Sequence, residues 1–186
     1  MSTAHILHGQ TNANDATAAA GCMWWAPSDT WLTKPLCRRY TFAALKTLRL
    51  PVCHRDSVKH LHWHWALGLL KQGQYEVLGA WPGEAMSALV ASDLHRRGVV
   101  HIGAVSSEGA ADFASRYPET ASWPSSDEDV QGFGAGRRAA LQAAAATAER
   151  LQASIARTIK RRGPFADESA ASDYLVQALQ KADRRF

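Results

Sequence analysis

The sequence predicts an α+β fold, and three observations support this prediction. Residues Lys59–Leu70 alternate polar and apolar side chains at their start, as a strand with one buried face does. Two later runs, Tyr75–Trp81 and Val99–Val105, are short and rich in β-branched or aromatic residues, which is typical of strands. Residues 139–162 instead repeat apolar side chains at the spacing of an amphipathic helix. We therefore expect an antiparallel sheet of about four or five strands with helices on one face, followed by a helical appendage.

The composition favours one globular domain with a core of its own. The chain has 186 residues, of which 46% are hydrophobic and seven are tryptophans. No apolar run reaches the roughly 18 residues of a membrane-spanning helix, so we expect no membrane partner. The three cysteines, Cys22, Cys37 and Cys53, are far apart and odd in number. This pattern argues against a disulfide framework and for a reducing, cytoplasmic location.

The chain divides into three regions. Residues 1–21 are of low complexity and lack the basic start and apolar block of a secretory signal, so we expect a flexible N-terminal arm. Residues 22–136 contain the predicted strands and form the expected α+β domain. Residues 137–186 form the expected basic helical appendage.

Several elements can be placed from their spacing and from the residues that end them. Residues 38–50 fit a helix or a strand, and Pro51 should end this element. Residues 118–136 are rich in Pro, Gly, Ser and acidic side chains and are expected to form a linker or long loop. The expected helices cover residues 84–97, 108–117, 139–162 and 167–185.

The positive charge lies mainly at the C-terminal end. Residues 1–136 hold 11 Lys and Arg against 12 Asp and Glu, whereas residues 137–186 hold 10 against 5. This distribution permits a polyanionic partner such as DNA, and a solvated helix surface would explain it equally well. The candidate DNA-binding residues are Arg137, Arg138, Lys160, Arg161 and Arg162.

Three histidines at alternate positions suggest a metal site. On a strand, His60, His62 and His64 would share one face, with neighbouring side chains about 7 Å apart. That spacing would let two imidazoles bind one cation, and imidazole suits several divalent metals. The alternative is that these side chains simply face water.

The order of these elements resembles that of the HUH endonucleases of rolling-circle replication, in particular the phage and prophage initiators. His62–Leu67, HWHWAL, is similar to the His-hydrophobic-His strand of that family. Phe113–Tyr117, FASRY, stands where the family's helix carries its tyrosine and lysine. Gly132–Arg137, GFGAGR, is similar to a glycine-rich segment of the prophage relatives. The resemblance covers roughly residues 50–138.

The resemblance implies a protein that binds single-stranded DNA and nicks it by tyrosine attack, with help from a divalent metal. Tyr117 would be the nucleophile, because Phe113 at the family's first tyrosine position has no hydroxyl. Arg116 would take the place of the family's lysine at the phosphate. The metal, Mn²⁺ or Mg²⁺ and less typically Zn²⁺, would be held by His62, His64 and His54.

Two other interpretations stay open at this point. One is a relative that binds DNA but does not cut it, because the first tyrosine is missing. The other is an unrelated metal- or partner-binding module that forms a homodimer through the helix at residues 139–162.

Overall fold

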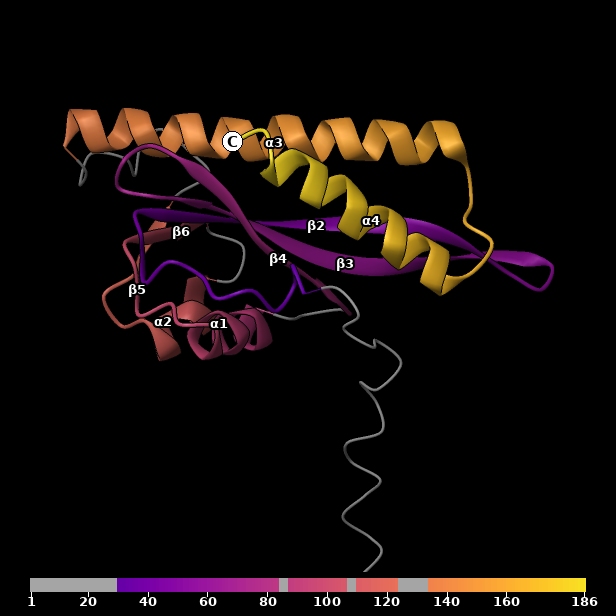
Figure 1. Ribbon diagram of the computed structural model, residues 1–186, viewed down its shortest axis with the longest axis horizontal. Coiled ribbons are helices and arrows are strands. Elements are labelled where there is room, and N and C mark those ends of the chain that lie inside the picture. Colours follow the sequence, from indigo (N-terminus) through magenta and orange to yellow (C-terminus); the bar gives the residue numbers. More distant parts are fainter. Residues whose placement is uncertain (1–29, 84–86, 107–109, 124–133) are drawn as a thin grey trace, which may run out of the picture.

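The chain folds into one mixed five-stranded sheet with helices on both faces (Figure 1). The computed structural model describes residues 30–83, 87–106, 110–123 and 134–186. The expected N-terminal arm and part of the loop expected at residues 118–136 lie outside these ranges. Helices α1 and α2 cover one face of the sheet, and the longer α3 and α4 cover the other.

The sheet has the strand order β4-β3-β2-β6-β7. Within this sheet, β2, β3 and β4 are antiparallel neighbours that follow one another along the chain. Strand β6 runs parallel to β2, and β7 runs parallel to β6. These strands are Phe42–His54 (β2), Ser57–Leu69 (β3), Tyr75–Pro82 (β4), Ala104–Ser106 (β6) and Ala121–Trp123 (β7). A separate parallel pair is formed by β1 (Arg39–Tyr40) and β5 (His101–Ile102).

The α+β class is confirmed, but the expected arrangement was wrong in two respects. The sheet is mixed rather than antiparallel, and helices lie on both of its faces. The cause is the connection after β4, because a chain that returns to form a strand parallel to β2 needs a crossover, usually helical. The helices are α1 (Ser87–Arg96), α2 (Ala110–Arg116), α3 (Ala135–Arg162) and α4 (Glu168–Asp183).

Pro51 was expected to end an element, and instead it lies inside β2. The odd-numbered residues of β2 direct their backbone groups to the outer edge, away from β3. The amide of Leu45 donates to the hydroxyl of Ser106, and the carbonyl of Pro51 accepts from the amide of Phe165 at 2.8 Å. A proline at such a position removes no hydrogen bond from the β2–β3 ladder, so the strand continues through it.

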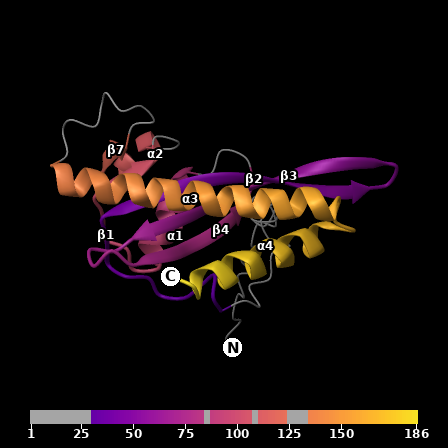
Figure 2. The same cartoon turned by 90° about the horizontal axis from the view of Figure 1, so that it is seen from above.

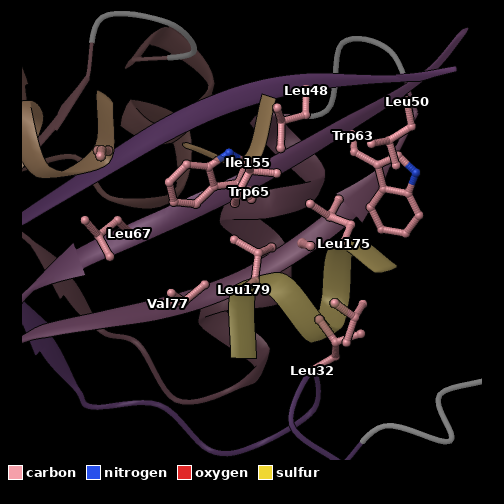
Figure 3. Close-up of a cluster of buried hydrophobic side chains, with 14 of the residues drawn as sticks. Leu32, Leu48, Leu50, Trp63, Trp65, Leu67, Val77, Ile155, Leu175 and Leu179 are labelled. Carbon is pink, nitrogen blue, oxygen red and sulfur yellow. The ribbon is translucent and has the colours of Figure 1, made fainter. Parts of the chain in front are cut away.

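The larger core lies between the sheet and the α3–α4 layer (Figures 2 and 3). Trp63 and Trp65 on β3 are fully buried there. The apolar stripe of α3 packs against the same strands, and α4 closes the cluster. Residues 137–186 therefore contribute to the same core as the sheet. The buried helix residues are Leu141, Ala144, Ala148, Ile155, Ile159, Ala171, Leu175, Val176, Leu179 and Ala182.

Gln152 connects this core to the edge of the sheet. The indole N–H of Trp65 donates to Gln152 Oε1 at 2.7 Å, and Gln152 Nε2 donates to the carbonyl of Thr47 on β2. One side chain of α3 thus satisfies a buried donor and an edge acceptor together. This pair of hydrogen bonds holds the middle of α3 at a defined position along β2.

Asp183, at the end of α4, anchors that helix to β4 and to the segment before β1. Its carboxylate accepts from Trp31 Nε1 at 2.8 Å, from Lys34 Nζ at 2.9 Å and from the amide of Val77 at 2.7 Å. Lys34 also pairs with Glu76 at 3.0 Å. Burial alone would lower the pKa of Lys34, but its bonds to Asp183 and Glu76 outweigh burial and raise that pKa above 10.5.

Replacing Gln152 with alanine should lower the free energy of unfolding by about 1–3 kcal/mol, because the indole N–H of the buried Trp65 loses its acceptor. Urea denaturation followed by tryptophan fluorescence measures this change. The exposed Gln142 on the same helix is the matched control, and its replacement by alanine should cost less than about 0.5 kcal/mol. Equal effects at the two positions would show that the Gln152 bonds contribute nothing.

A second prediction concerns high pH. Because the folded-state pKa of Lys34 is raised, its contribution to stability is fully present below pH 10.5 and is lost as the pH rises through the folded value. The difference in unfolding free energy between the natural protein and Lys34→Met should therefore be constant up to about pH 10 and shrink above it. Thermal unfolding at a series of pH values measures this difference, and a gap that persists undiminished above the folded pKa would contradict the assignment.

Candidate nucleic-acid interface

His62 and His64 lie on the internal strand β3, on the face opposite the buried Trp63 and Trp65. Both imidazoles are half-buried. The Nδ1 atom of His64 lies 3.1 Å from the hydroxyl oxygen of Thr47, its neighbour across the β2–β3 ladder. Same-face neighbours on a strand are about 7 Å apart, so these two imidazoles are adjacent.

Arg49 stands directly across the ladder from His62. Side chains at such paired positions start with their Cβ atoms about 4.5–5.5 Å apart. A guanidinium keeps its positive charge at every pH at which the protein folds. The two imidazoles therefore lie beside a fixed positive charge on this face of the hairpin.

The third expected ligand, His54, is not brought near His62 and His64. It lies at the tip of the β2–β3 hairpin, five residues beyond Arg49, or roughly 17 Å along the strand. The alternation of β2 also places it on the other face of the sheet. Among the described residues, no group of three or more His, Cys, Asp or Glu side chains is positioned to hold a metal ion.

Tyr117, the expected nucleophile, lies just past the end of α2 with its ring buried. Its hydroxyl is 3.3 Å from the carbonyl oxygen of Ala91 and 3.4 Å from that of Val99. Burial raises the pKa of Tyr117 to about 12. The hydroxyl is thus held inside a smaller apolar core between the sheet and the helices α1 and α2, where a phosphodiester cannot reach it unless that core opens. Arg116, the expected phosphate ligand, is exposed.

The expected DNA-binding residues of α3 fall into two groups. Arg137 donates to the carbonyl of Gly103 at 3.3 Å, and the guanidinium of Arg162 lies over the rings of Phe165 and Tyr174 at 5.0 and 5.5 Å. Arg138, which is half-buried, belongs with these residues that contact the protein itself. The second group is exposed and consists of Lys160 and Arg161.

A groove runs between the outer edge of β2 and α3, with a volume of about 430 Å³. Two of its lining residues, Arg49 and Lys160, have basic side chains, and His60 also lines it. None of the described residues that line it is acidic. The other lining residues are Thr47, Leu48, Pro51, Gln152, Ala156 and Ile159.

Arg49 was not predicted as a site residue from the sequence. Its partner across the ladder is His62, but residues 38–50 fitted a helix as well as a strand, so no face could be assigned to it. Had the strand been chosen, alternation from Leu48 and Leu50 would have placed Arg49 on the polar face. Its closeness to Lys160, which is 111 positions later in the chain, carries no local signal.

Neither a scan against models of protein families nor a search of curated proteins finds a match to this chain. Within the described part of the chain, no helix has both the length and the apolar character needed to cross a membrane.

Replacing Tyr117 with phenylalanine should lower the free energy of unfolding by about 0.5–1.5 kcal/mol, because the buried hydroxyl loses its carbonyl acceptors. Urea denaturation measures this change. The same substitution at the half-buried Tyr75, whose hydroxyl has no hydrogen-bond partner among the described residues, is the control and should change stability by less than about 0.5 kcal/mol. A Tyr117→Phe protein of unchanged stability would mean that the hydroxyl is not held as described.

Proposed function

We propose that the chain binds single-stranded DNA through its phosphate backbone and does not cut it through Tyr117. The observation that carries this proposal is the charge of α3. Seven basic residues and one acidic residue, Glu149, lie on this helix. Glu149 is paired with Lys46 of β2, so the acid does not offset the other basic side chains of the helix.

The shape of α3 adds to this argument. Its apolar stripe, which was considered as a dimer interface, packs against the chain's own sheet. The opposite side faces solvent along the whole helix and carries Arg157 and Arg161, both exposed. Lysine and arginine on an exposed helix face are the groups that contact phosphates without reading sequence.

Part of this charge also has a structural role. Lys160, Arg161 and Arg162 lie in the last turn of α3, where positive charge interacts favourably with the helix dipole, by about 0.3–1 kcal/mol each. The dipole does not explain Arg157, which lies more than one turn before the helix end, or Arg49, which is on a strand. Phosphate binding accounts for all of them together.

Binding is favoured over tyrosine-dependent nicking by the position of the Tyr117 hydroxyl. An attacking oxygen must reach the phosphorus, and this one lies against the carbonyls of Ala91 and Val99. Binding to the backbone needs no such group and no bound metal.

The natural protein should therefore bind a fluorescein-labelled oligothymidylate, with an affinity that falls steeply as salt rises. Replacing Arg157 and Arg161 with alanine should make the slope of log K against log salt shallower by about 1.4, because a single strand releases roughly 0.7 counterion for each phosphate contact. Arg157 is preferred here to Arg162, whose guanidinium packs on Phe165 and Tyr174. Fluorescence anisotropy across a salt series measures both quantities.

The control removes the same charge elsewhere, at the exposed Lys71 in the β3–β4 turn and the exposed Lys181 on α4. This pair should leave the slope nearly unchanged. Absence of binding by the natural protein at low salt would refute the proposal. A covalent protein–DNA adduct on denaturing gels with Mn²⁺ or Mg²⁺, lost in Tyr117→Phe, would replace it with the nicking activity.

A further inference from the structure

We infer that the groove between β2 and α3 is the site that holds the DNA backbone, with Arg49, His60 and Lys160 as its phosphate ligands. This inference rests on the proposed function and goes further, because it names the site and the way the strand lies in it. Three independent features of the groove support it.

The first feature is a gap in the hydrogen bonding of the outer edge of β2. Pairing with β6 is limited to Ala43, and the hydroxyl of Ser106 then accepts a hydrogen bond from the amide of Leu45 at 2.8 Å. Further along β2, the carbonyl of Phe165 accepts a hydrogen bond from the amide of Cys53 at 2.8 Å. Between these points no other described residue bonds the amides of Thr47 and Arg49, which the alternation of the strand directs to the same edge. Backbone N–H groups at a sheet edge are suitable donors for a phosphate oxygen.

The second feature is positive charge that no acidic side chain of the described residues neutralises. Among the described residues, the side chains of Arg49, His60 and Lys160 enter no ion pair or hydrogen bond. Elsewhere in the described structure, basic side chains form ion pairs with acidic ones, as Lys34 does with Glu76 and Asp183. The groove is therefore complementary to an anion.

The third feature is the length and the lining of the groove. It follows β2 from Thr47 to Pro51, which is about 13 Å of strand, so it suits a chain of repeating anions better than a single phosphate. Its lining includes the apolar side chains of Leu48, Ala156 and Ile159, which can pack against sugars. None of the described residues that line it is aromatic, so they offer bases no stacking platform, and little base preference is expected.

The test is the double substitution Arg49→Gln and Lys160→Gln, which keeps polar side chains at two exposed positions. With the labelled oligothymidylate, affinity should fall roughly tenfold near 100 mM salt, and the slope of log K against log salt should become shallower by about 1.4. The Lys71→Gln, Lys181→Gln protein is the control of equal charge and should keep the natural affinity and slope. Each variant loses one positive charge from the last turn of a helix, so circular dichroism melting should give the two variants the same small decrease in Tm, of about a few degrees at most.

Other outcomes separate this inference from the proposed function. If the natural protein does not bind DNA, both fail. If it binds, and the Arg157→Ala, Arg161→Ala protein loses affinity while the groove variant does not, DNA binding stands and the groove is not its site. If polyglutamate displaces the oligothymidylate as effectively as unlabelled oligothymidylate does, the groove holds acidic chains in general, and the inference of a nucleic-acid site is overturned.

Discussion

Burial of the tryptophan face of β3 is the constraint on which the other elements depend. Trp63 and Trp65 are fully buried in the middle of the sheet. Side chains of this size bury about 150–250 Å² each, which corresponds to roughly 4–6 kcal/mol apiece as an upper estimate. A single antiparallel sheet cannot cover them, so a second layer is needed over that face. Helices α3 and α4 supply this layer, and the polar face of the hairpin is thereby turned to the other side.

The requirement to satisfy polar groups in that core also sets the position of α3. Gln152 can bond both Trp65 and the Thr47 carbonyl only when this part of α3 lies beside the outer edge of β2. Two turns later the same helix carries Lys160, which then lies beside the groove. The groove is thus a consequence of core packing: the helix is held by its buried face, and its exposed basic residues are carried to the sheet edge.

The parts of the fold that could be predicted are those with a local periodic signal. Alternation in β3 and the apolar stripe of α3 each extend over many residues, so the face that packs inward can be read directly from the chain. The mixed sheet could not be predicted this way. Strands β6 and β7 have three residues each, which is too short for a period to show, and their parallel pairing depends on partners distant in the chain. The prediction that Pro51 ends an element was wrong because proline disrupts a strand only where its missing N–H would join the ladder. Whether it does depends on which edge of the strand its backbone faces.

In the candidate site too, some features have a local sequence signal and others depend on the folded structure. Residue type and spacing mark the histidines of β3 and the basic end of α3 as candidates, since both are local features. They were insufficient for Tyr117, because a tyrosine at a helix end can face a ligand or the core, and only the carbonyls of Ala91 and Val99 distinguish the two. The proposal that the groove is an anion site depends on how the acidic side chains are distributed in the described part of the chain. Glu76, Asp93 and Asp183 are engaged with Lys34, Arg96 and Arg97 at other places in the fold. Arg49 and Lys160 form no ion pair with these acidic side chains, which instead stabilise contacts elsewhere in the described structure.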